Sequence, residues 1–245
     1  MADASDDDKL CGKLVMKFCQ ILDSAGVPNV LWGNYLLTIY GVPTITDDVA
    51  FVVPDDKIKK ASSALEQSGL PPCAKQLSCP HLRGFQARPP SEHVHVSDEL
   101  ALSLYRKSDT LWEFEGLHGG QFEKPLDILS ASDVRLPSAI PGRGRGRLSP
   151  EYSLVRIPSA ARFCEALILL LCRDYNTIYE TYWMALLTYI LEYVDETDIF
   201  DVNNLADEYK EFFFALKKGD SSMFLLLDQL RCTLFSSGRL SIEYT

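Results

Sequence analysis

Apolar positions in the first third of the chain alternate between helical spacing and short continuous runs. Residues 9–25 carry apolar side chains at helical spacing and are predicted to form a helix. Residues 30–32 and 49–53 are short apolar runs typical of buried strands. Helices are expected between and after these runs, over residues 35–40 and 58–67.

The remainder of the chain changes character near its middle. Residues 93–96 and 126–129 are predicted strands, whereas the apolar stretch 101–105 fits either a strand or a helix. Residues 137–158 are rich in Pro, Gly and Arg and are interpreted as a linker. Everything after this segment has helical periodicity, which predicts helices over residues 160–173, 178–194, 202–217 and 222–235.

Early strands followed by late helices define the expected fold class. We expect an α/β (α+β) domain over residues 1–136, with a small mixed sheet and flanking helices. The linker 137–158 and a helical domain over residues 159–245 follow.

Composition and charge narrow the class of function. The chain has 245 residues, of which 47% are hydrophobic and 24% charged, so a globular core is expected. The net charge of −10 does not favour binding to nucleic acid or to an anionic membrane. No secretory signal or membrane-spanning run is recognisable, and a cytoplasmic or nuclear location is expected rather than secretion.

The residues that suggest a chemical function lie in a glycine turn and in a predicted strand that begins with acidic residues. Gly33 and Asn34 follow the first predicted strand, and Asp47 and Asp48 lead the second. Asp127 lies in a later predicted strand. Residues i and i+2 of a strand share one face, so carboxylates at that spacing can hold divalent metals together with a third acid.

This order of elements resembles the nucleotidyltransferase superfamily over roughly the first 135 residues, a length that fits one domain. The resemblance implies Mg²⁺ or Mn²⁺ held by Asp48 and Asp127, with Gly33 and Asn34 close to a nucleotide phosphate. The family has a second carboxylate two residues after the first, where this chain has Ala50. The segment 32–54 is also similar to uncharacterised fungal proteins with variable acids on this strand.

Three interpretations of Ala50 stay open: a degenerate site, an active site that has been rearranged, or an engineered change. Our first hypothesis is a nucleotidyltransferase-fold protein with an impaired two-metal site. It would bind a nucleotide or other small ligand in a cleft between the sheet and the helical half. One alternative is a metal-independent cyclase or isomerase of fungal secondary metabolism, and another is a non-enzymatic interaction module.

Further residues are candidates for binding or catalysis. His93 and His95 share a strand face and are candidate acid–base groups. Together with Cys73 and Cys79, these histidines offer four metal-ligating side chains. The spacing Cys73-x5-Cys79 is wider than the tight cysteine pairs of zinc sites, so we favour an ordinary loop beside a strand over a metal site. The remaining candidate ligand-binding residues are Asp47, the two arginines Arg143 and Arg145 in the Gly-Arg repeat of residues 142–147, and Arg173 and Tyr175 near the end of a predicted helix.

Overall fold

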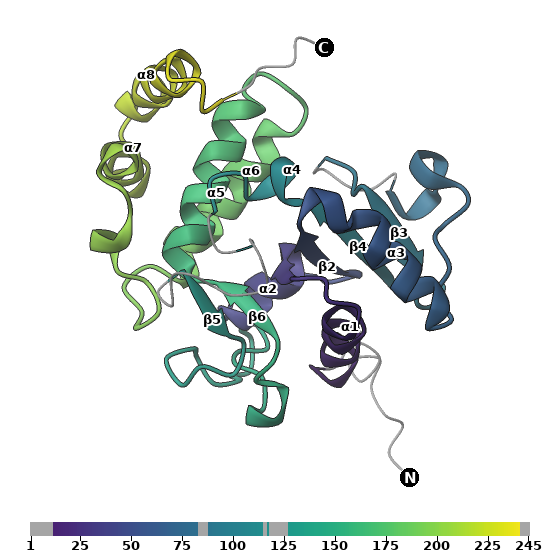
Figure 1. Cartoon of the computed structure of the whole chain (residues 1–245). Helices are drawn as coiled ribbons and strands as arrows, with labels where there is room; N and C mark the ends of the chain where they lie inside the picture. Colours follow the sequence, from purple (N-terminus) through teal and green to yellow (C-terminus); the bar gives the residue numbers. More distant parts are fainter. Residues whose placement is uncertain (1–11, 83–87, 115–116, 118–126, 241–245) are drawn as a thin grey trace. The chain divides into compact units, whose positions relative to one another are not determined.

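The computed structural model describes residues 12–82, 88–114, 117 and 127–240 (Figure 1). The chain forms two compact units. Unit 1 comprises residues 1–85 and 89–159, and unit 2 comprises residues 86–88 and 160–245.

Unit 1 is built around a four-stranded mixed sheet with the strand order β1-β2-β4-β3. Strands β2 and β4 are parallel, while β1 pairs with β2 and β3 pairs with β4 in antiparallel fashion. The helices and strands of this unit are α1 (Gly12–Ser24), β1 (Val30–Trp32), α2 (Gly33–Ile39), β2 (Asp48–Val53), α3 (Ile58–Gln67), β3 (Glu92–His95), β4 (Ala101–Arg106), α4 (Lys107–Thr110), β5 (Ile128–Ser130) and β6 (Arg156–Pro158).

The central strands form the core of unit 1. Every residue of β2 is buried, which explains why residues 49–53 form a continuous apolar run and not an alternating one. Helix α3 packs on β4, and α1 packs beside α3. The sheet therefore holds the side chains of β2 and β4 in a rigid, water-poor setting.

A second, two-stranded antiparallel sheet consists of β5 and β6. The hydroxyl of buried Tyr40 donates a hydrogen bond to the carbonyl of Pro158 at 2.6 Å. Arg156 donates two hydrogen bonds of 2.9 Å to the carboxylate of Asp23 in α1. These bonds fix β6 to the elements that carry the main sheet.

The predicted linker 137–158 lies inside unit 1 and is packed. The amide of Gly144 donates to the carbonyl of Gly41, and that of Gly146 donates to the carbonyl of Thr38, both at 2.9 Å. A Cβ at Gly144 would lie 2.5 Å from the Thr38 oxygen. The glycines of the Gly-Arg repeat therefore allow close backbone approach, and they do not act here as a flexible spacer.

Unit 2 is helical. Its helices are α5 (Ala160–Arg173), α6 (Glu180–Tyr193), α7 (Asp207–Lys218) and α8 (Ser222–Ser236). Every residue of α5 except Arg162 and Arg173 is buried, so α5 is the central helix, with α6 and α8 packed against it. Among the described residues, no helix is long and apolar enough to cross a membrane.

A buried carboxylate organises the end of α5. Asp174 is fully buried and accepts hydrogen bonds from Arg88 (3.0 Å), Arg173 (2.9 and 2.8 Å) and the indole of Trp183 (2.8 Å). Burial alone would raise the pKa of Asp174, but the hydrogen bonds and the charges of the two arginines bring this pKa below its ordinary value. Arg88 thereby belongs to unit 2, although its chain neighbours from Pro89 onward belong to unit 1.

The expected fold class is confirmed, because a small mixed sheet with flanking helices precedes a helical C-terminal half. The ambiguous stretch 101–105 forms strand β4. The helix predicted over 202–217 is divided into a 3-10 turn, Val202–Asn204, and α7. Strand β6 was not expected from its sequence.

Candidate functional site

The pairing register of the main sheet brings one row of side chains onto a common face. Ala50 in β2 lies opposite Trp32 in β1 and beside Ser103 in β4. Ser103 in turn lies opposite His93 in β3. Directly paired residues point to the same side of a sheet, so these four side chains cross one face of the sheet in a line.

The neighbouring row extends this face toward the start of β2. Asp48 lies beside Ala101, and Ala101 lies opposite His95. Since Asp48 precedes Ala50 by two residues, and His95 follows His93 by two, both rows share the face. The structure therefore brings the two predicted histidines to the same sheet face as Asp48, which strand periodicity alone could not establish.

The glycine turn also lies on this face. Gly33 has a φ of +73°, which favours glycine, and a Cβ built there would lie 3.6 Å from the Cβ of Ala50. Asn34 is half-buried in the first turn of α2. The position of the missing second carboxylate therefore faces the turn that the resemblance assigns to phosphate binding.

Three buried polar atoms on this face lack hydrogen-bond partners among the described residues. They are Oδ2 of Asp48, Oγ of Ser103 and Nε2 of His93, and their residues are 5%, 0% and 4% exposed. Buried polar atoms are usually hydrogen-bonded, because desolvation without a partner costs about 1–3 kcal/mol. A cluster of three such atoms marks this face as the candidate site.

Burial changes the acid–base properties of this site. It raises the pKa of Asp48 to about 7, the negative charge of Asp47 adds to the rise, and the nearby Ser103 hydroxyl opposes it without a well-formed hydrogen bond. Burial also lowers the pKa of His93, and the neighbouring His95 and His81 add to this effect. At neutral pH, Asp48 is therefore only partly ionised and His93 is uncharged.

The other predicted acids lie outside this buried cluster. Asp47 is exposed and precedes β2, with its backbone carbonyl accepting a hydrogen bond from Ala101 at 3.1 Å. Asp127 is half-buried and directly precedes β5 of the second sheet, where its carbonyl accepts from Ser159 at 2.7 Å. Asp48 thus begins β2 of the main sheet, whereas Asp127 stands just before β5 of the second sheet.

The predicted basic and aromatic ligand-binding residues are distributed over both units. In unit 1, Arg143 is exposed, and the guanidinium of Arg145 lies 5.5 Å from the centre of the Tyr35 ring. In unit 2, Arg173 binds Asp174, and the Tyr175 ring lies 5.3 Å below the guanidinium of Arg231.

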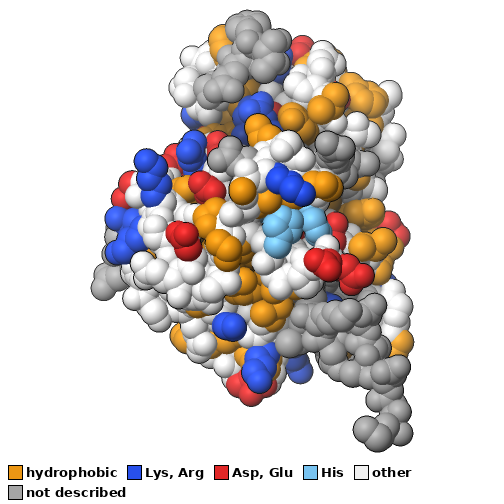
Figure 2. Space-filling model, turned by 90° about the vertical axis from the view of Figure 1, so that its right-hand side faces the viewer, with side chains coloured by type: hydrophobic (Ala, Val, Ile, Leu, Met, Phe, Trp, Pro, Cys, Tyr) orange, Lys and Arg blue, Asp and Glu red, His pale blue; other side chains and the backbone are white. Residues whose placement is uncertain are grey.

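The structure also assembles a group that the sequence spacing did not favour. Cys73 and Cys79 lie beside His93 and His95, and one ligand atom from each residue lies within 4.8 Å of the others. Figure 2 shows histidine side chains gathered in one patch of the surface. The 13 residues between Cys79 and His93 gave no indication of this contact, which depends on the chain returning to β3.

Comparisons with known proteins add structural matches only. No protein-family model and no curated protein matches the chain. Two solved structures of the antibiotic-resistance factor ANT(2'')-Ia are similar to this chain. The solution structure has 15% sequence identity and a TM-score of 0.37, and the match covers 93% of this chain and 92% of that chain. The crystal structure in complex with adenylyl-2''-tobramycin has 14% identity and a TM-score of 0.38, and the match covers 93% of this chain and 98% of that chain. A third is an antigenic nucleotidyltransferase-like protein from Paracoccidioides brasiliensis, with 15% identity and a TM-score of 0.42, and the match covers 95% of this chain and 93% of that chain.

These three matches are distant similarities only. With identities of 14–15% and TM-scores below 0.5, they carry no weight for the function of this chain.

Proposed function

We propose that unit 1 is a nucleotidyltransferase-like domain with an impaired two-metal site, which binds a nucleotide on the sheet face shared by Gly33 and Asp48. The observation that supports this proposal most directly is the position of Ala50. Its side chain shares the Asp48 face and lies against the Gly33 turn. In the nucleotidyltransferase motif that this sequence resembles, a second carboxylate occupies this position.

The residues present do not fit a pair of divalent cations. Ala50 offers no ligand atom, and Asp127 stands outside the main sheet, just before β5. We therefore propose nucleotide binding and assign no metal-dependent transfer step to this chain.

The polar groups on the face suit a small ligand. A backbone turn that only glycine adopts easily leaves room for close approach at Gly33. The unsatisfied atoms of Asp48 and Ser103 supply a carboxyl and a hydroxyl, which hydrogen-bond to sugar hydroxyls or base edges. Buried polar groups of this kind give a binding site its selectivity.

Calorimetric titration with ATP, GTP, CTP and UTP, each with and without Mn²⁺, tests this proposal. We expect binding of at least one nucleotide, weakened in Gly33→Val, whose side chain would fill the turn beside Ala50. The Glu66→Gln variant is the control, because Glu66 is exposed on α3. Ala50→Asp restores a second carboxylate and should make binding depend on Mn²⁺.

The absence of heat with all four nucleotides in the wild-type chain would overturn the proposal. Equal affinities of the wild type and Gly33→Val would show that any binding occurs elsewhere.

A further inference from the structure

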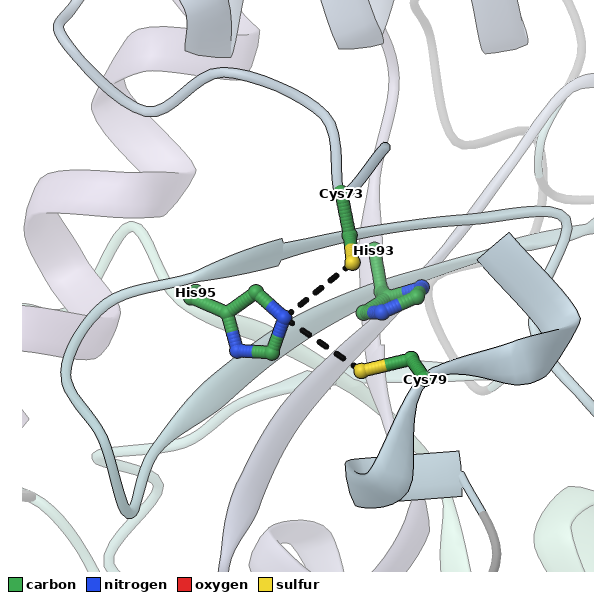
Figure 3. Close-up of side chains that lie close together, drawn as sticks. All are labelled: Cys73, Cys79, His93 and His95. Carbon is green, nitrogen blue, oxygen red and sulfur yellow. Dashed lines mark hydrogen bonds between the residues drawn. The ribbon is translucent and has the colours of Figure 1, made fainter. Parts of the chain in front are cut away.

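Four side chains with metal-ligating atoms converge at one edge of unit 1, on β3 and the segment that precedes it (Figure 3). His93 and His95 come from the same face of β3. Cys79 lies between two 3-10 turns, Gln76–Ser78 and Pro80–Leu82, and Cys73 lies in the loop before them. Their side chains point toward a common centre.

The distances match a tetrahedral site. Nε2 of His95 lies 3.2 Å from Sγ of Cys73 and 3.4 Å from Sγ of Cys79. With zinc–sulfur bonds of about 2.3 Å and zinc–nitrogen bonds of about 2.1 Å, tetrahedral angles place nitrogen and sulfur about 3.6 Å apart. All four ligand atoms lie within 4.8 Å of one another, so small side-chain shifts suffice to bring them around one ion.

Hydrogen bonding alone does not satisfy this group. Nε2 of His95 carries either one lone pair or one proton, so it cannot form full hydrogen bonds with both thiols at once. His93 is 4% exposed, and its Nε2 has no hydrogen-bond partner among the residues that the structure describes. A single cation accepts one lone pair from each of the four side chains and removes this deficit.

The backbone around the cluster is fixed independently of any ion. The amide of Cys73 donates to the carbonyl of His93 at 2.8 Å, and Pro72 forms a bridge with Val94. The ring of His81 lies edge-on to His95, with 4.9 Å between ring centres, and its Nε2 lies 2.8 Å from the carbonyl of Asp98. The ligands are therefore held in place by their surroundings, as in established metal sites.

The donor set indicates which metal is bound and what role it has. Two thiolates and two imidazoles suit zinc, whereas Mg²⁺ and Ca²⁺ prefer oxygen ligands. Four protein ligands complete the tetrahedron and leave no position for substrate, which is typical of structural sites.

We propose that Cys73, Cys79, His93 and His95 form a structural zinc site, which fastens the segment 72–82 to β3. The inference does not require nucleotide binding, although His93 belongs both to this cluster and to the candidate face. It assigns His93 and His95 to metal ligation and not to acid–base catalysis. It also ties the loop after α3 to the strand that flanks the candidate site.

Metal analysis of the untagged full-length chain tests the proposal. After dialysis against metal-free buffer, we expect one zinc ion per chain. Cys79→Ser should lower the affinity for zinc more than about 100-fold, since even changes around the ligands of a zinc site cost about 10–100-fold. The control is Cys232→Ser, because Cys232 is exposed in unit 2, and this variant should retain its zinc.

Cobalt provides a readout that does not require the variant to fold. Wild-type protein stripped of metal and titrated with Co²⁺ should show the strong visible absorption of a tetrahedral ion together with thiolate-to-cobalt charge transfer, and zinc should displace it. Chains purified with no zinc and giving no such spectrum would overturn the proposal. Loss of zinc from Cys232→Ser, with retention in Cys79→Ser, would also overturn it.

Discussion

Replacing Asp48 with asparagine tests whether the central carboxyl of the candidate site is as desolvated as its position indicates. Asparagine has nearly the same shape but carries no ionisable group, so the change removes the titration and keeps the packing. Asp48 is 5% exposed, and burial raises its pKa from 3.8 to about 7. Between these two pH values the folded chain retains a proton that the unfolded chain has lost.

The direction and size of the effect follow from this difference. When the folded state binds more protons, raising the pH lowers the free energy of unfolding. Each unit of pKa difference corresponds to about 1.36 kcal/mol, so the whole shift amounts to about 4 kcal/mol. About 2.5 kcal/mol of this falls between pH 5 and pH 8. The stabilisation is therefore fully present only below pH 3.8, and it is lost progressively as the pH rises from there to about 7.

Urea unfolding followed by circular dichroism, at several pH values from 5 to 8 and without added divalent metal, measures the effect. We expect Asp48→Asn to match the wild type only below pH 3.8, and its excess stability over the wild type to grow by about 2.5 kcal/mol between pH 5 and pH 8. Asp47→Asn is the comparison and should keep most of the pH dependence of the wild type, since Asp47 contributes less than burial to the raised pKa of Asp48. Parallel stability curves for Asp48→Asn and the wild type would refute the reasoning.

Two further predictions concern packing in each unit. Asp174→Asn should destabilise unit 2 by about 3–5 kcal/mol, because it leaves two arginines beside a neutral, buried side chain; thermal unfolding would show this, and the exposed Asp198→Asn is its control. An unchanged melting temperature in Asp174→Asn would contradict it. Gly144→Ala should lower the stability of unit 1 by more than about 2 kcal/mol, because its Cβ would meet the Thr38 oxygen at 2.5 Å. Gly142→Ala should lower the stability by only about 1 kcal/mol, because its Cβ would lie in open space and only the φ of +79° disfavours a side chain. A larger loss of stability in Gly142→Ala than in Gly144→Ala would count against a packed loop.

The elements with strong periodicity and clear ends could be predicted from the sequence. Helices α3 and α5 begin and end at the predicted residues, because each has an apolar face and a breaker beside it. The stretch 101–105 could not be assigned, since a strand buried on both faces has no alternation. The packing of residues 137–158 was missed because it depends on contacts with Gly41 and Thr38, which are distant in sequence.

The arrangement of the candidate site could also be predicted only in part from the sequence. Periodicity within one strand already places His93 and His95 on a common face. Only the register between strands places His93 opposite Ser103 and thus on the Asp48 face. The convergence of Cys73 with His95 could not be predicted at all, because it arises from the return of the chain to β3 and not from local spacing.

The position of Arg88 in the sequence affects where the chain can be cut and how it folds during synthesis. It supplies part of the positive charge around Asp174, yet it is encoded long before the helices of unit 2. During synthesis, this arginine emerges from the ribosome first and meets its carboxylate only after α5 has followed. A gene fragment that begins at Ala160 would encode the helices without one of the counter-charges of their buried acid. Truncation or exchange of the helical half at this boundary would therefore yield a weakened product, and a genetic fusion should carry residue 88 with it.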